Sequence, residues 1–347
     1  MNTTAPSTTA GQASLQLEYL SSDQVASQSA AWRQTVLGVV GFEKPPAIER
    51  AQFPVTASMT RSLSTGNPCE VWRVSGPRVQ WAGHTGESRV SYRYCEDLLF
   101  GSLTIEEQDD SQDEAEGLRR ATEIAYQEIF EVLEETEHRH LIRVWNYLPD
   151  INREAGGDER YRLFNSARQM AFRNSGRATM GTVPAACALG SPAGSPISIY
   201  FLAARRPPKM IENPRQTSAY HYPPKFGRHS PIFSRACLWG ESGSSKLFVS
   251  GTASIVGHET IHRGDVVAQT RETLVNIKAL LDEANRIVGS GRYSMEGLKL
   301  KVYVRRASDL PAIQATLSAS LRNATRILYL QADVCREDLL VEIEAVG

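Results

Sequence analysis

The chain closes on the stretch Leu339-Leu340-Val341-Glu342-Ile343-Glu344-Ala345, in which apolar and acidic residues alternate toward the end. Alternation with a period of two is typical of a β-strand, because successive side chains point to opposite faces of a sheet. The two acids therefore share one face of the predicted strand, and the apolar residues share the other. Taken alone, the pattern favours a strand whose acidic face meets solvent.

The segments before this strand alternate between strand and helix patterns. A helix is predicted from about residue 265 to 288, because apolar residues recur there every three or four positions. Asp309 and Pro311 suit the start of a second helix, as a capping residue and a first-turn residue. Strands are predicted around these helices at residues 234–239, 246–255, 298–305, 326–331 and 339–346.

The first half of the chain shows the same order of elements. An acidic run at residues 105–117 leads into an apolar stripe that begins at Leu118, which predicts a helix with acidic residues at its positive end. A strand at 140–147, a helix at 158–173 and a strand at 197–204 follow. The halves repeat at an offset of roughly 150 residues. We therefore predict an α+β fold of two similar units, each a mixed sheet with two helices packed on one face.

The predicted boundaries follow from this repeat. Residues 1–30 begin with a Thr- and Ser-rich stretch and are predicted to be a disordered tail. The first unit is expected over residues 31–228 and the second over 229–347. The first unit ends in a Pro-rich loop, and the segment 207–230 around it could act as a lid.

Composition bounds the expected partners and location. The 347 residues carry a net charge of -1 and no block of Lys or Arg, so neither nucleic acid nor an anionic membrane is an expected partner. No apolar run reaches the ~20 residues that span a bilayer, and the start of the chain lacks the features of a signal peptide. The five cysteines are far apart and form no CxxC pair, which argues against disulfides or structural zinc and predicts a cytoplasmic protein.

Four short stretches stand out in the second half: Val249-Ser250-Gly251, Gln269-Thr270-Arg271, Asn276-Ile277-Lys278 and Val341-Glu342-Ile343-Glu344-Ala345. In sequence and in order they resemble those of the small RidA/YjgF proteins. The resemblance implies a RidA-like fold for the second half. Fold by itself does not give function.

A narrower resemblance covers nearly the whole chain after the tail. The stretches HLIRVWNY at 140–147, ERYRLFN at 159–165, SGTASIVGHET at 250–260 and ADVCR at 332–336 look like those of the chorismatases. That resemblance implies two RidA-like units, as a monomer or a homotrimer, with a pocket lined by both units. It also implies cleavage of chorismate to pyruvate and a hydroxybenzoate, mainly 3-hydroxybenzoate, without a metal or organic cofactor.

Chorismate carries two carboxylates and an enol ether, so its binding calls for two cationic clamps in a partly desolvated pocket. Arginine suits this task because its planar fork meets a carboxylate with two hydrogen bonds. Tyrosines on the neighbouring strands and in the Pro-rich segment are the expected hydroxyl donors. The candidate substrate-binding residues are Arg143, Tyr147, Arg162, Tyr200, Tyr222, Arg235 and Arg305.

Cleavage of the enol ether needs a proton on its terminal methylene carbon, and a positioned carboxylic acid can supply it. The RidA and chorismatase resemblances imply that Glu342 is this acid, so we predict that burial raises its pKa. In the family, a Cys at position 335 with a Gly at position 251 goes with formation of 3-hydroxybenzoate. Cys335 and Gly251 are therefore the other candidate catalytic residues. A larger residue than Gly251 goes with hydrolysis to a dihydroxycyclohexadiene carboxylate, which is the first alternative.

The residues suggest three further alternatives. Residues 258–262 match the HExxH pattern of zinc proteases, but that chemistry needs a helix, and Gly257 and Gly264 flank the stretch. An imine deaminase of the RidA type needs an Arg on the strand before the closing one, and Arg326 is one residue out of phase. A non-catalytic small-molecule-binding protein stays open, and turnover separates it from an enzyme.

Overall fold

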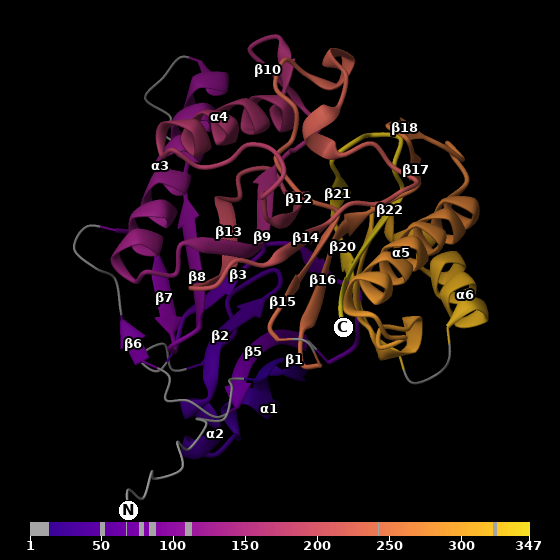
Figure 1. Cartoon of the computed structure of the whole chain (residues 1–347). Coiled ribbons are helices and arrows are strands. Elements are labelled where there is room, and N and C mark those ends of the chain that lie inside the picture. Colours follow the sequence, from indigo (N-terminus) through magenta and orange to yellow (C-terminus); the bar gives the residue numbers. More distant parts are fainter. Residues whose placement is uncertain are drawn as a thin grey trace, which may run out of the picture.

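The computed structural model describes residues 14–48, 53–66, 68–75, 80–82, 88–107, 113–241, 243–321 and 325–347. Within these ranges the chain forms two seven-stranded sheets, one four-stranded sheet and two short ribbons (Figure 1). Residues 1–13 of the predicted tail and residues 108–112 of the acidic run lie outside them.

The first unit is a seven-stranded sheet with two helices on one face (Figure 1). Helix α3 (Glu114–Glu135) begins at Asp113, whose side chain accepts a hydrogen bond from the Ala115 amide. Helix α4 (Arg160–Asn174) packs beside it. In spatial order the strands are β21 (Asp333–Val334), β12 (Ala185–Ser191), β9 (His140–Pro149), β13 (Ile197–Ala204), β8 (Leu98–Ile105), β7 (Ser91–Tyr94) and β6 (Gln80–Ala82).

The second unit has the same build. Helix α5 (Val266–Val288) is capped by the Asp265 side chain, and helix α6 (Leu310–Ser320) has a proline in its first turn. In the described ranges no helix is both long and apolar enough to cross a bilayer. In spatial order the strands are β14 (Lys209–Ile211), β15 (Ala236–Trp239), β16 (Lys246–Thr252), β22 (Val341–Val346), β19 (Lys299–Val304), β20 (Arg326–Gln331) and β4 (Arg61–Ser62).

The pairing of the strands shows that the two units repeat one topology. Strand β9 lies parallel to β12 and antiparallel to β13, just as β19 lies parallel to β20 and antiparallel to β22. Strands β8 and β16 complete the match, because each pairs antiparallel with the last strand of its own unit. The predicted α+β fold and internal repeat are thus confirmed.

A third, four-stranded sheet was not predicted. It consists of β1 (Ser14–Ser21), β5 (Pro68–Ser75), β2 (Val36–Gly41) and β3 (Val55–Ala57), and the short helices α1 (Ser22–Ala26) and α2 (Ala30–Gln34) lie between β1 and β2. Strand β1 pairs with β5 along its whole length and buries Leu15 and Leu17. The prediction of a disordered tail is therefore wrong for residues 14–30, because an apolar alternation there is buried against a partner far along the chain.

The inner faces of the three sheets meet in a shared core. Trp72 of β5 lies between Trp145 of β9 and Phe248 of β16, with ring centroids 5.6 and 6.1 Å away. The helices cover the opposite face of each large sheet and form separate cores with it. As a result, the face of β22 that carries its two acids turns into the protein.

Candidate active site

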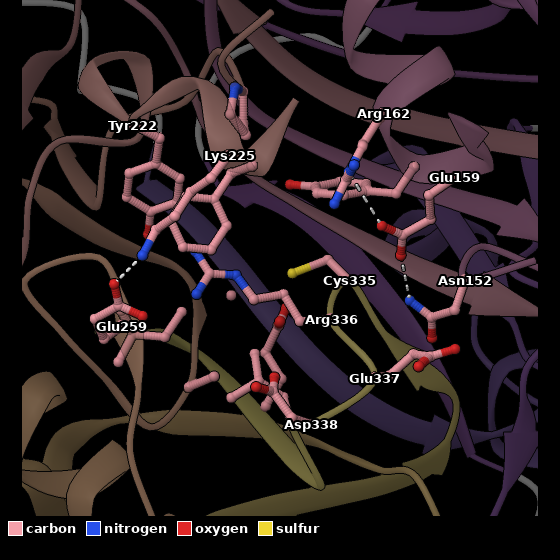
Figure 2. Close-up of a pocket in the computed structure, with 18 of the residues that line it drawn as sticks. Asn152, Glu159, Arg162, Tyr222, Lys225, Glu259, Cys335, Arg336, Glu337 and Asp338 are labelled. Carbon is pink, nitrogen blue, oxygen red and sulfur yellow. Dashed lines mark hydrogen bonds and ion pairs between the residues drawn. The ribbon is translucent and has the colours of Figure 1, made fainter. Parts of the chain in front are cut away.

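A cavity of about 660 Å³ opens between the two units (Figure 2). The first unit lines it with the ribbon of β10 (Glu154–Ala155) and β11 (Asp158–Glu159) and the start of α4. The second unit contributes β16, β22, the segment that precedes β22, and Ala253, Ile255, Glu259 and Arg263 of the segment after β16. Residues of the connecting segment 222–235 complete the lining.

The side chain of Glu342 reaches this cavity from β22 and is only 4% exposed. The solvent-facing interpretation of its strand is therefore wrong, since the third sheet and the first unit cover that face. Burial and the nearby charge of Glu344 raise the pKa of Glu342 to about 8, against the opposing influence of Arg143 and other arginines. The predicted rise is confirmed, and a carboxyl with this pKa is mostly protonated at neutral pH.

Gly251 makes room for that carboxyl. The pairing of β16 with β22 shifts register between Val249 and Thr252, which places Gly251 in a β-bulge beside Glu342. A Cβ on Gly251 would lie 2.7 Å from Cδ of Glu342 and 3.1 Å from Cβ of Cys187. A residue with a side chain at this position would therefore displace the carboxyl or its surroundings.

Ser250 fixes the bulge to the first unit. Its hydroxyl donates to the Ser234 carbonyl at 2.6 Å and accepts from the Ala186 amide of β12 at 2.9 Å. The bulge therefore has a defined place at the junction of the two units.

The thiol of Cys335 lies in the cavity wall (Figure 2). Burial and the nearby Glu342 raise the pKa of Cys335 to about 12. At neutral pH this side chain is a thiol rather than a thiolate, so it is suited to pass a proton and unsuited to nucleophilic attack.

Two guanidinium groups in the lining each have a buried nitrogen without a hydrogen-bond partner in the described part of the chain. Arg235 donates to the Thr217 carbonyl and to the Tyr222 hydroxyl, both at 2.7 Å. Arg336 stacks on Phe226 at 4.1 Å and donates to the His258 carbonyl at 2.9 Å. Among the described residues, the buried Nε of Arg235 and Nη2 of Arg336 have no hydrogen-bond partner. Buried donors are nearly always paired, so these two are available to an anionic ligand.

Other charged groups lie on the first-unit side and over the cavity. Arg162, on the first turn of α4, is 3.5 Å from Glu159 and is partly exposed. Tyr222, Lys225 and Phe226 lie in the Pro-rich segment above the cavity, and Lys225 forms an ion pair with Glu259 of the second unit (Figure 2). The segment thus covers the cavity, and its movement as a lid stays a prediction.

Three predicted binding residues lie on the inner faces, outside the cavity lining. Arg143 bonds to Glu344 at 2.5 Å, Tyr147 to the Tyr303 hydroxyl at 2.9 Å, and Tyr200 to Lys301 at 2.9 Å. These partners engage the two tyrosine hydroxyls and one nitrogen of Arg143, whereas the buried Nη1 of Arg143 has no hydrogen-bond partner among the described residues. Their placement does not support direct contact with a ligand in this cavity.

Arg305 also lies outside the lining. Its guanidinium bonds to three carbonyls of residues 334–339 and to the side chains of Asn152 and Asp333. All three of its nitrogens are thereby engaged. Arg305 holds in place the segment that carries Cys335 and Arg336, and its role as a ligand clamp stays a prediction.

The competing patterns also have defined places. Residues 258–262 form strand β18 (Glu259–Thr260) and a turn in which His262 has a φ of 57°, so the two histidines do not share a helix face. Arg326 is exposed at the start of β20. Of the zinc-protease pattern only Glu259 lines the cavity, where it pairs with Lys225, and Arg326 is not part of the lining.

Arg336 and Phe226 are site residues that the sequence analysis missed. The ADVCR stretch contains Arg336, but nothing in the local pattern shows that it stacks on an aromatic ring from the distant Pro-rich segment. A pairing of this kind is visible only in the folded chain.

Proteins with a similar sequence or fold include chorismatases and a 3-hydroxybenzoate synthase. The family model "Chorismatase FkbO/Hyg5-like, N-terminal" matches residues 70–203. A 3-hydroxybenzoate synthase of Streptomyces hygroscopicus is 43% identical over 236 residues, 65% of this chain and 68% of the relative. A chorismatase of Streptomyces rapamycinicus is 35% identical over 331 residues, 90% of this chain and 92% of the relative. The crystal structure of a chorismatase matches with a TM-score of 0.81 at 29% identity and covers 96% of this chain and 99% of that one.

Proposed function

The chain belongs to the chorismatase family, and we propose that it cleaves chorismate to pyruvate and a hydroxybenzoate, chiefly 3-hydroxybenzoate. One observation carries the proposal: a carboxyl with a pKa of about 8 reaches a cavity whose buried arginines have unpaired donors. This combination suits a dianion that must receive a proton on carbon.

Binding uses the spare guanidinium donors. Chorismate is a dianion, and Arg235 and Arg336 present hydrogen bonds in a cavity where hydrogen bonds to charged groups are strong. Tyr222 lies between them, because Arg235 bonds to its hydroxyl and the Arg336 guanidinium lies 5.1 Å from its ring. Arg162 adds positive charge on the first-unit side of the cavity.

The first chemical step is proton transfer from Glu342 to the terminal methylene carbon of the enol ether. This step forms a methyl group and leaves a cation that is stabilised by the ether oxygen. Glu342 becomes a carboxylate, and the charges of Arg143 and Arg235 favour that form. A general acid of this kind accelerates a reaction by about 10²- to 10⁴-fold.

The ring then completes the reaction without water. Its 4-hydroxyl oxygen bonds to C3 while the bond from C3 to the side-chain oxygen breaks, so pyruvate leaves as a ketone. The hydroxyl proton returns to Glu342. The resulting arene oxide opens at C4 as Cys335 donates a proton to its oxygen, and the thiolate regains a proton as the ring becomes aromatic. Pyruvate and 3-hydroxybenzoate together contain all atoms of chorismate.

Hydrolysis is the alternative within the family, because water could capture the cation and leave a dihydroxycyclohexadiene carboxylate. The thiol of Cys335 and the space at Gly251 favour the intramolecular route. The experiment is to incubate the chelator-treated protein with chorismate, measure released pyruvate, and identify the ring product by mass spectrometry and NMR. We expect equal amounts of pyruvate and 3-hydroxybenzoate.

Glu342→Gln should lower this turnover by about 10²- to 10⁴-fold. Glu337→Gln is the matched control, because Glu337 lines the same cavity but is exposed. A dihydrodiol product would replace the proposed product within the same family, and bound but unchanged chorismate would favour a binding protein. Absence of both binding and turnover would redirect the search to imine substrates.

A further inference from the structure

A second carboxylate lies two residues from Glu342 on the same face of β22. We propose that Glu344 is a positioning residue for the reaction: its carboxylate, held ionised by Arg143 and Lys301, keeps the neighbouring Glu342 carboxyl protonated. The inference deepens the proposed function and rests on it for its kinetic readout.

The contacts of Glu344 are those of a charged group. Its Oε2 accepts from Arg143 at 2.5 Å, and its Oε1 accepts from the Trp145 indole at 2.8 Å. Lys301, directly opposite on β19, forms an ion pair with Oε1 at 2.7 Å. Although burial favours the neutral acid, Lys301 and Arg143 hold the pKa of Glu344 below its ordinary value.

Glu342 has none of this support. In the described part of the chain its side chain takes part in no hydrogen bond or ion pair, and its neighbour on β19 is Tyr303, whose hydroxyl bonds to Tyr147. One strand face therefore carries two carboxyls in opposite surroundings. Surroundings that push the pKa values of two carboxyls apart in this way keep one carboxyl ionised and leave the proton on the other.

The charges around the pair support this division. Arg143 and Lys301 are balanced by Glu344 and by Glu70 of β5, which also pairs with Lys301. A charge on Glu342 would be an additional negative charge beside this balanced cluster, and Glu344 is the acid that disfavours it most. The titratable and charged groups that face the pair are Tyr19 of β1, Glu70 of β5, Arg143 and Tyr147 of β9, Cys187 of β12, Tyr200 of β13, Lys301 and Tyr303 of β19, and Arg235, Arg305, Cys335 and Arg336 at the cavity side.

Arg143, Arg235 and Arg305 act in the other direction, because their charges lower the pKa of Glu342. Arg143 donates its short hydrogen bond to Glu344 rather than to Glu342, and Arg305 is bonded to the segment 333–339. Removal of the Glu344 charge would leave these cations facing Glu342 alone. The expected effect of that removal is therefore a fall in the pH at which Glu342 loses its proton.

The third sheet supplies a matched control. Glu70 accepts from the Trp72 indole at 2.6 Å and shares Lys301 with Glu344, but it lies on β5 and is not among the main groups that shift the pKa of Glu342. Glu70→Gln removes one negative charge from the same buried cluster without touching the residue beside Glu342. Glu344→Asp keeps the negative charge on β22 and shortens the side chain that carries it by one methylene.

The test is a titration of the ligand-free protein, labelled with ¹³C at the Glu carboxyl carbons, from pH 5 to pH 10. In the wild type we expect Glu342, assigned with Glu342→Gln, to titrate near 8 and Glu344 to stay ionised throughout. Glu344→Gln should lower the Glu342 midpoint by about one pH unit or more. Glu344→Asp and Glu70→Gln should leave it near the wild-type value, and the midpoint in kcat/KM for chorismate should follow each titration.

Two results would overturn the inference: a protonated Glu344 in the wild type at pH 7, or equal shifts in Glu344→Gln and Glu70→Gln. If Glu344→Gln does not fold, the wild-type and Glu344→Asp titrations still decide, because Glu344 must be ionised in the wild type and Glu342 must keep its high midpoint in both proteins. Lack of turnover with chorismate would remove the proposed function but would not change the titration result. The two failures are thus distinguishable.

Discussion

Gly251 lies so close to Glu342 that a Cβ at this position would stand 2.7 Å from the Cδ of the acid. Gly251→Ala should therefore move the Glu342 carboxyl and lower 3-hydroxybenzoate formation by about 10²-fold, within the range that a misplaced general acid loses. The remaining product should shift toward the dihydrodiol. Product analysis by NMR together with kcat checks both changes.

Gly297→Ala is the control for this substitution. Gly297 lies in the same unit, and the nearest atom to an added Cβ is the Ser294 hydroxyl oxygen at 3.8 Å. We expect unchanged turnover. Equal product ratios in Gly251→Ala and the wild type would contradict a role for the close approach.

Glu342→Gln should stabilise the protein at high pH. The pKa of Glu342 is about 8 in the folded chain and near 4.5 when unperturbed, so between these values the folded state holds a proton that the unfolded state has lost. This contribution to stability is present below about 4.5 and is lost as pH rises through 8. The variant should therefore gain up to roughly 5 kcal/mol in unfolding free energy above pH 8 and little at pH 5.

Urea unfolding at pH 5 and at pH 8.5 measures this difference. Glu337→Gln, at an exposed position, should show no such dependence on pH. An equal effect of Glu342→Gln at both pH values would mean that the carboxyl titrates normally.

Arg336→Met should weaken substrate binding. It removes a guanidinium that stacks on Phe226 and has a free donor, so KM for chorismate should rise by about 10- to 100-fold, as expected for a lost hydrogen bond to a charged group. Arg336→Lys should not restore binding, because Lys lacks the planar fork. Arg263→Met is the control, since Arg263 lines the same cavity with a side chain that is 68% exposed. A similar KM in both Met variants would remove Arg336 from the binding site.

Cys335→Ala should separate the two halves of the reaction. Protonation by Glu342 does not need the thiol, so pyruvate release should stay within about 10-fold of the wild type, which is less than the loss of a general acid costs. The share of 3-hydroxybenzoate should fall, because the arene oxide loses its proton carrier. Cys69→Ala, in the third sheet, should change neither quantity. An unchanged product share in Cys335→Ala would rule out the thiol as that carrier.

The repeat was predictable because its strands and helices show strong periodicity. The strands at 197–204 and 326–331 begin and end where the apolar patterns predict. Strand β12 was missed, because Ala, Gly and Cys dominate it and these residues give no strand pattern. The third sheet was missed because β1 gains its stability from β5, more than 40 residues later in the chain. Local patterns do not report such pairings.

The candidate site was predictable where a residue's role depends on its own strand and motif. Glu342, Cys335 and Gly251 meet at the cavity, as do Arg162, Tyr222 and Arg235. Strand periodicity also places Arg143 correctly on an inner face, but it does not tell which part of that face lines a cavity. Trp72 and Glu70 of the unpredicted sheet pack against the inner face that carries Arg143, Tyr147 and Tyr200. These three residues are therefore buried in a packed cluster.

The two units of the repeat differ at the position of Glu342. Ser198 lies opposite Tyr147 in the first unit, just as Glu342 lies opposite Tyr303 in the second, and the two tyrosines bond to each other. An assembly of identical subunits would place an acid at both positions and form equivalent centres. In this molecule the pseudo-symmetry is broken by a serine, so calorimetric titration should saturate at one ligand per polypeptide.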